Sequence, residues 1–384
     1  MNDGWLFLLL LALLYLSDCA QVVRRSGVAF VSFFGRSRHP RLPSELLGTP
    51  RGGLVMLNPL PPLGTVFRVE WPAFSVSPRG VLCGSPERLA GSGHGGGADA
   101  FVLLAPGVQA AGEQRDVCVG RRSVARFRTA GAARRAAEWL QACVGAPEER
   151  RGEIIRSALA ESFDVAAIRG IAAQCRAATR LLVWLGNGMW GLLFVVAPLA
   201  VVRYGILLTF IPLALTVVAL HVGILWTCWR THRRVLPAER DARLEHVLKM
   251  LFCPPLAIRA VDAVSADLLD GRHPVAVALA IATPREAKDL ALKWRRDLEY
   301  PLSPAPESPE CAQADSWFRS RLAGAAAAAA ASAKVNMEEA LQAPAAGGKD
   351  ERSYCPRCHM TYRVAAGTCP DCLGLALKPL PGKA

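Results

Sequence analysis

The sequence predicts a membrane protein in which an N-terminal helix and a transmembrane α-helical hairpin accompany a small α+β domain, a helical bundle and a cysteine-rich tail. Two runs without a charged side chain support the hairpin: residues 181–202 and residues 204–229. At about 1.5 Å per residue, each run is long enough to cross a hydrocarbon layer of about 30 Å. The chain on both sides of this pair is much more polar, which indicates soluble parts before and after the hairpin.

Changes in composition divide the 384 residues into seven segments. We expect a transmembrane anchor at 1–23, a basic α+β domain at 24–145, amphipathic helices at 146–180, the transmembrane hairpin at 181–229, a helical bundle at 235–300, a flexible linker at 301–353 and a metal-binding tail at 354–378.

The N-terminal segment has two interpretations. Residues 5–16 are apolar but span only about 18 Å as a helix, so spanning requires extension to residue 23 across Ser17, Asp18 and Gln21. A cleaved signal peptide would need a positive region before the apolar run, and only Asp3 is charged there. An uncleaved anchor agrees better with the arginines that follow, which the positive-inside rule places in the cytoplasm: Arg24, Arg25, Arg36 and Arg38.

Arginines at the hairpin borders predict the same orientation. Three arginines precede the first run and three follow the second, whereas only Arg203 lies in the turn: Arg169, Arg176, Arg180, Arg230, Arg233 and Arg234. We therefore expect a multi-pass protein of a bacterial inner membrane, with its soluble parts mainly cytoplasmic. Trp184, Trp226 and Trp229 lie near the ends of the runs, as in an aromatic belt.

Positive charge is concentrated in the first part of the chain. Residues 1–234 carry 26 Lys and Arg against 14 Asp and Glu, whereas residues 235–384 carry 19 against 18. A basic surface beside anionic headgroups makes membrane lipids an expected partner, although an arginine-rich, alanine-rich composition explains the charge without any partner. No basic groove with interleaved aromatic residues is visible, which argues against nucleic-acid binding.

The residue pattern of segment 24–145 predicts short strands followed by a helix. β-rich stretches at 54–57, 65–69, 74–77, 80–83, 101–104, 116–119 and 123–128 alternate with Pro and Gly. Thr129 is positioned to cap a helix over 132–143. Residues 28–34 form either an interfacial segment or a strand. This order of elements resembles a small pleckstrin-homology-like barrel, and a generic α+β domain is the alternative.

Helical patterns occupy much of the remaining chain. Residues 164–180 have an amphipathic pattern that predicts a helix on the membrane surface or a stalk into the hairpin. We expect bundle helices over 237–252, 256–269, 273–282 and 284–299. Thr283 and Glu286 form a capping box around Pro284, which marks the start of the last helix. The Pro-, Ala-, Gly- and charge-rich residues 301–353 indicate a flexible linker.

The chain ends in a C-x2-C-x10-C-x2-C array formed by Cys355, Cys358, Cys369 and Cys372. Two tight turns can each aim two thiolates at one ion, completing a tetrahedron with bonds of about 2.3 Å. The array resembles a zinc ribbon over this last stretch only. That resemblance implies a closed, structural Zn²⁺ site, with strands at 360–364 and 373–377. Rubredoxin-like iron and a redox dithiol are the alternatives, and His359 is expected to be exposed rather than coordinating.

The other eight cysteines lie singly, which favours free thiols in a reducing compartment over a disulfide framework. The sequence G-x-G-x-x-G at 91–96 precedes a loop and strand rather than a helix, so it does not indicate a dinucleotide site. Five histidines have no carboxylate or cysteine at motif spacing: His39, His94, His232, His246 and His273. Asn187 and His221 in the hairpin are expected to hydrogen-bond between spans.

These observations favour a non-enzymatic membrane adaptor or assembly protein that contacts a protein partner through a cytoplasmic zinc ribbon. The absence of catalytic motifs argues against an enzyme, and the sequence identifies no catalytic residue and no small-molecule substrate. One alternative is a membrane-bound enzyme with a site in residues 40–145, gathering His39, Glu70 or Glu87. A lipid-sensing module built on residues 24–180 is another.

Overall fold

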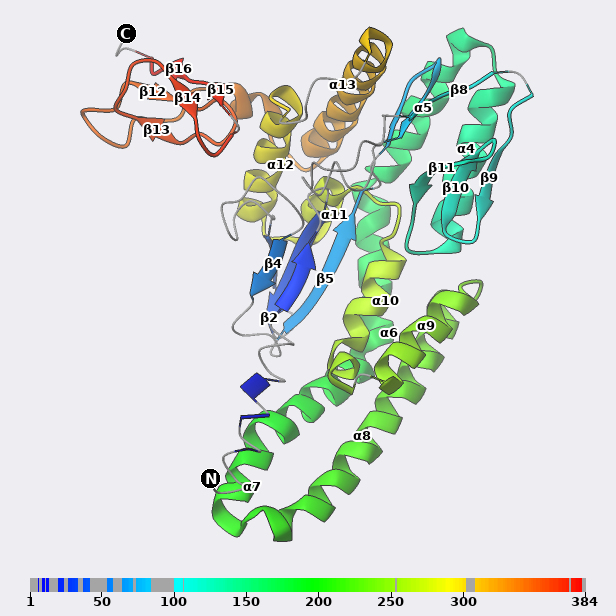
Figure 1. Cartoon of the computed structure of the whole chain (residues 1–384), viewed down its shortest axis with the longest axis vertical. Helices are drawn as coiled ribbons and strands as arrows, with labels where there is room; N and C mark the ends of the chain where they lie inside the picture. The colour runs from blue at the N-terminus through cyan, green and yellow to red at the C-terminus, as the bar shows by residue number, and fades with distance from the viewer. Residues whose placement is uncertain are drawn as a thin grey trace.

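The computed structural model is elongated, with a helical hairpin at one end, the cysteine-rich tail toward the other and an α/β body between them (Figure 1). The structure describes residues 6, 9–10, 12–13, 20–23, 27–33, 37–41, 54–57, 64–71, 74–83, 100–105, 107–252, 254–301, 308–372 and 374–381. The Gly-rich stretch 91–96 and Glu87 lie outside these residues.

The N-terminal part contains short antiparallel strands. They are β1 Ala20–Val23, β2 Gly27–Phe33, β3 Ser37–Arg41, β4 Leu54–Leu57, β5 Gly64–Glu70, β6 Phe74–Val76, β7 Gly80–Cys83, β8 Ala100–Leu103, β9 Ala110–Glu113, β10 Asp116–Val119 and β11 Arg122–Arg126. They pair as β1-β4, β3-β2-β5, β6-β7-β8 and β11-β10-β9. Each stretch expected to be β-rich has a strand here. The described strands form separate small sheets, however, so the expected pleckstrin-homology-like barrel is wrong for this part of the chain.

The expected anchor over residues 1–23 is wrong at its end. Ala20–Val23 is strand β1, which pairs with β4 in the register Ala20↔Leu57 to Val23↔Leu54. The stretch includes Gln21 and two β-branched valines, which suit a strand better than the end of a membrane helix. The described residues between 6 and 13 are helical and exposed.

Helix α4, Ala130–Gly145, begins at the expected cap. The Thr129 hydroxyl accepts a hydrogen bond from the Ala132 amide. Glu239 accepts from the amides of Ala130 and Gly131 at 2.9 and 2.6 Å, and Asp270 accepts from the Thr129 amide at 2.8 Å. These donors are the unpaired amides at the positive end of the helix dipole. Two carboxylates from turns between the later helices therefore join α4 to the helical part of the chain.

A long helical arm leads into the hairpin. It comprises α5 Glu148–Ser162, α6 Val165–Gly191, the π-helical segment η1 Leu192–Val196 and α7 Ala197–Tyr204, and α8 Ile206–Val235 returns. Pro198 has no amide hydrogen for the residue 194 carbonyl, which explains the widened turn at η1. Gly205 makes the hairpin turn with φ of 78°, a conformation that glycine adopts without strain.

The helical stretch Glu148–Tyr204 and helix Ile206–Val235 are each long and apolar enough to cross a membrane. Only 22% and 6% of their most apolar windows are buried inside the protein. The first part of α6 buries Ile168 and Cys175 beneath α10 (Ala260–Leu268) and α11 (Pro274–Ile281). Of the two expectations for residues 164–180, a stalk into the hairpin therefore describes α6 better than a helix lying on a membrane surface.

The later helices are α9 Arg240–Phe252, the 3₁₀ segment η2 Pro254–Arg259, α10 Ala260–Leu268, α11 Pro274–Ile281, α12 Pro284–Glu299, α13 Pro309–Ser332 and the 3₁₀ segment η3 Met337–Leu341. Helix α11 is buried almost throughout, as expected for residues 273–282. At the start of α12, Thr283 Oγ1 accepts from the Glu286 amide and donates to the Glu286 carboxylate, so Thr283 caps the helix at the predicted position.

The flexible linker expected over residues 301–353 is wrong for most of its length. Ser308 caps the 24-residue helix α13, and the helix buries Phe318, Leu322 and Ala330 in the main core. Alanine has the highest helix propensity and its small side chain permits close packing, so an Ala-rich segment can become a core helix once it has a partner surface. Residues 302–307 lie outside the described part.

Two large apolar cores lie among the residues that the structure describes, apart from the small cluster around the tail cysteines. The larger combines strand residues such as Val28 and Phe30 with Leu140 of α4, Ile168 of α6 and Val277 of α11. The parts expected as an α+β domain and a helical bundle therefore share one core. The smaller core lies at the base of the hairpin and includes Leu182, Ile224, Cys228, Met250 and Val264.

Candidate metal centre

The cysteine-rich tail consists of two small antiparallel sheets. Strands β12 Ser353–Tyr354, β13 Thr361–Tyr362 and β16 Lys378–Pro379 form one sheet in the order β13-β12-β16, and β14 Thr368–Cys369 pairs with β15 Leu375–Ala376 in the other. The expected strands at 360–364 and 373–377 each contain one of these short strands. Each sheet carries one cysteine pair at a strand end.

The first pair lies in a tight turn. The Cys355 amide donates to the Met360 carbonyl at 2.9 Å, and the His359 amide donates back to the Cys355 carbonyl at 2.9 Å. His359 has φ of 62°, which closes the turn. The amides of Arg357 and Cys358 donate to the Cys355 sulfur. This turn directs amide hydrogens toward a sulfur, an arrangement that stabilises a thiolate.

The second pair lies in a similar turn. The Cys372 and Gly374 amides both donate to the Cys369 carbonyl, at 3.3 and 3.0 Å. Gly374 has φ of 83°, which a residue with a side chain adopts only with strain. The two prolines, Pro356 and Pro370, each follow the first cysteine of a pair, so the two turns match in sequence as well as in role.

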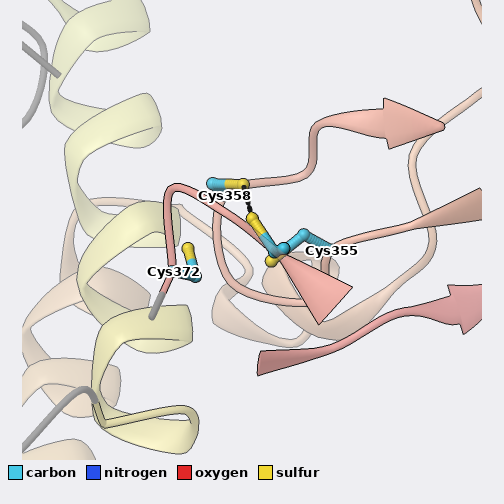
Figure 2. A group of neighbouring side chains, drawn as sticks. Cys355, Cys358 and Cys372 are labelled. Atoms are coloured by element: carbon cyan, nitrogen blue, oxygen red, sulfur yellow. Dashed lines mark hydrogen bonds between the residues drawn. The ribbon is translucent and has the colours of Figure 1, made fainter. Parts of the chain in front are cut away.

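All four sulfur atoms converge. They lie within 4.8 Å of one another, and Figure 2 shows the side chains of Cys355, Cys358 and Cys372 turned toward a common centre. The Cys358 and Cys369 sulfurs are 3.7 Å apart. A tetrahedral Zn²⁺ with bonds of about 2.3 Å needs sulfurs about 3.8 Å apart. The four clustered thiols are therefore compatible with one metal ion such as zinc.

A hydrogen bond between two of the thiols shifts their pKa values in opposite directions. The pKa of Cys358 is lowered, chiefly because the Cys372 thiol donates a hydrogen bond to it. The same bond raises the pKa of Cys372, and burial raises the pKa of Cys355. A cation bound by four thiolates replaces these shared protons, so metal binding releases protons from the cluster.

The surroundings of the cluster suit a closed site. Cys355 and Cys369 are fully buried, Cys372 is buried and Cys358 lies at the exposed edge. The Tyr362 hydroxyl lies 3.1 Å from the Cys369 sulfur, and Arg296 interacts electrostatically with Cys358. Four sulfur ligands fill a tetrahedral shell and leave no position for a substrate.

The tail is docked on helix α12. Arg357 pairs with Asp297 at 2.9 Å and donates to the Tyr300 carbonyl, while Arg296 donates to the Arg357 carbonyl at 2.9 Å. Lys378 donates to the Tyr300 hydroxyl at 2.7 Å. These contacts hold the tail against the body, so it is not a freely tethered module.

The structure also brings together residues that sequence spacing does not connect. His232 of α8, His246 of α9 and Asp267 of α10 meet at the base of the hairpin. Each residue comes from a different helix, so no spacing rule identifies the group. The spacing along the chain predicts no carboxylate partner for either histidine, and the structure corrects this with Asp267.

The enzyme alternative places a site in residues 40–145, which the structure describes only in part. A cavity of about 440 Å³ lies between α4, α5 and α13, lined by apolar side chains such as Trp71 and Trp139 and by charged side chains such as Arg135 and Glu138. The side chains of His39, Glu70 and Glu87 lie outside the described part, so that expected gathering is not tested.

Comparison with known proteins gives no relative: no protein family, no curated protein and no solved structure matches this chain. The cysteine centre therefore stands on its own geometry.

Proposed function

We propose that this chain is an integral membrane adaptor, anchored by the α6–α8 hairpin and carrying a structural zinc ribbon that contacts a protein partner. The observation that carries the proposal is the closed four-cysteine centre. A site without an open coordination position supports a folded surface rather than a reaction. Small tails cannot build a large apolar core, so a metal supplies the stability that a binding surface needs.

The hairpin supplies the anchor. Large apolar side chains along α7 and α8 are exposed, and Leu207 next to the turn is 90% exposed: Leu199, Val202, Leu207, Leu208, Phe210, Ile211, Leu215, Val218 and Val222. An apolar surface of this size is unfavourable in water and favours transfer to an apolar environment. Insertion into a lipid bilayer would bury the whole surface. Trp184 and Trp226 are exposed where each helix would leave the hydrocarbon layer.

The orientation of the proposed anchor follows from charge. Arg176 and Arg180 lie before the first span, Arg233 and Arg234 lie after the second, and Arg203 alone lies in the turn. We assign the body and the tail to the cytoplasmic side of an inner membrane, where reduced thiols remain available for zinc.

The proposed contact surface lies on the tail. Met360 and Val364 are 55% and 54% exposed beside the first cysteine turn, and the tail lies far from the hairpin (Figure 1). An exposed methionine and valine held on a rigid turn are typical of a protein-binding surface, since methionine adapts to varied partners. The body then serves as a spacer that presents this surface away from the membrane.

Site-specific photocrosslinking in cells tests the adaptor function. A photoreactive amino acid at Met360 or Val364 is expected to give a discrete crosslinked product that disappears when Cys355 and Cys372 are changed to serine. The same probe at Ser332, an exposed position on α13, is the matched control. Equal products from Ser332 and Met360, or products that persist without the cysteines, would count against the ribbon as the contact surface.

A further inference from the structure

Three ligand-type side chains meet where the hairpin joins the body. His232 Nε2 lies 3.3 Å from Asp267 Oδ2, and His246 Nε2 lies 2.7 Å from the same oxygen. Their side chains are 0%, 12% and 2% exposed for His232, His246 and Asp267. The group comes from α8, α9 and α10, which converge at this level of the molecule (Figure 1).

Both imidazoles direct Nε2 at the same carboxylate oxygen of Asp267. Two nitrogen atoms and one carboxylate oxygen therefore lie within 4.8 Å of one another at a largely buried point between three helices. Two histidines and one carboxylate are a common metal-binding set.

We propose that His232, His246 and Asp267 form a second metal site, for Zn²⁺ or a similar first-row divalent cation. Imidazole nitrogen and carboxylate oxygen bind such ions at about 2.0–2.2 Å, which places neighbouring donors of a tetrahedral shell about 3.3–3.6 Å apart. The 3.3 Å contact of His232 is at the lower end of this range, and the 2.7 Å contact of His246 has to lengthen by at least about 0.6 Å when an ion binds.

The neighbours of Asp267 fix how it binds. Arg128 donates from Nε to Asp267 Oδ1 at 3.2 Å, which leaves Oδ2 as the single metal-facing oxygen. A charged group that hydrogen-bonds to a ligating carboxylate and fixes its orientation is a common member of the second coordination shell of a metal site. The buried thiol of Cys228 lies one helical turn before His232 on the same face of α8, close enough to interact electrostatically with Asp267.

The site would fasten the hairpin to the body. His232 belongs to the end of the second hairpin helix, His246 and Asp267 belong to the helices packed on it, and Arg128 reaches in from the turn before α4. An ion here crosslinks three helices that otherwise rely on the small apolar core at the hairpin base. The ligands differ entirely from the cysteines of the tail, so each centre can be removed separately.

Metal content of the purified full chain tests the proposal. In detergent, after dialysis against Zn²⁺ and then against metal-free buffer, mass spectrometry is expected to find two zinc ions per chain. The variant Cys355→Ser with Cys372→Ser is expected to retain one, and His246→Gln is expected to retain one. The combined variant is expected to hold none. Asp241→Asn, at an exposed position of α9, is the matched control and keeps two.

Zinc titration of the cysteine variant gives a second readout. Adding His246→Gln to that variant is expected to weaken zinc binding more than about 100-fold, because loss of second-layer partners alone costs about 10–100-fold. A cysteine variant without bound zinc would overturn the proposal, as would a His246→Gln chain that still holds two ions. If His246→Gln does not fold, the zinc content of the cysteine variant decides alone, since its His232, His246 and Asp267 are intact.

Discussion

The ring of His273 is predicted to make folding stability depend on pH. It is fully buried at the start of α11, stacked on Phe163 with ring centroids 4.2 Å apart and flanked by Trp294 at 4.6 Å and Trp71 at 5.0 Å. Its Nδ1 accepts a hydrogen bond from the Val275 amide. Burial without a counter-ion lowers the pKa of His273 from 6.5 to about 3.

A lowered folded-state pKa fixes the direction of the effect. Below about pH 6.5 the unfolded chain binds a proton at this histidine and the folded chain does not, so stability falls as pH falls until about pH 3. From these two pKa values, the free energy of unfolding decreases by about 2 kcal/mol between pH 8 and pH 5. Above pH 7 the contribution is constant.

The variant His273→Asn isolates the contribution of this histidine to the pH dependence of the free energy of unfolding. Asparagine keeps an acceptor for the Val275 amide, as a good N-cap residue, but does not titrate. Its absolute stability is expected to be lower because the ring contacts are lost. Urea unfolding in detergent at pH 8 and pH 5 is expected to show a pH-dependent loss about 2 kcal/mol smaller in the variant than in the natural chain. Equal pH dependence in the two proteins would refute the reasoning.

Four further predictions follow from the packing and the metal centre. Ile168→Ala, at a fully buried position, is expected to lower the free energy of unfolding by about 2–5 kcal/mol, and the half-buried Ile171→Ala by less; equal losses would contradict the assigned core. Asp270→Ala removes the acceptor for the Thr129 amide and hydroxyl and is expected to cost about 2–3 kcal/mol in thermal unfolding, whereas a cost near zero would contradict the cap. Arg357→Ala breaks the contact with Asp297 and is expected to speed hydrogen exchange in residues 353–380 with zinc content unchanged; unaltered exchange would contradict docking on α12. Removing zinc with a chelator is expected to open the tail to trypsin near Arg363 while α4 to α13 stay protected, and unchanged cleavage would contradict a metal-stabilised tail.

The cysteine centre is predictable from the sequence because each pair of ligands is specified by a short stretch of neighbouring residues. Each cysteine pair needs only a two-residue turn, and the four residues that the spacing identified are the four whose sulfurs converge. The hairpin was predictable for a similar reason, since a long run without charge is visible in any window of the sequence. The caps of α4 at Thr129 and of α12 at Thr283 also depend on residues a few positions apart.

Long-range contacts explain what the sequence did not reveal. Residues 301–353 have no conspicuous apolar periodicity because α13 packs through alanines such as Ala326 and Ala330, whose burial depends on the surface they meet. The His232, His246 and Asp267 cluster joins positions 35 and 21 residues apart on different helices. Residues 20–23 form strand β1 rather than the end of an anchor helix. The sequence does not reveal this because the apolar N-terminal stretch continues directly into the strand and its pairing partner β4 lies far along the chain.

Alkaline extraction of membranes from cells that express the full chain tests the central claim, that the exposed apolar surface of α6–α8 is buried in a bilayer. The account predicts that the natural chain stays in the membrane pellet, and that a chain with Leu208, Ile211 and Leu215 changed to arginine moves to the supernatant. Recovery of the natural chain as a soluble, monodisperse protein without detergent would contradict it.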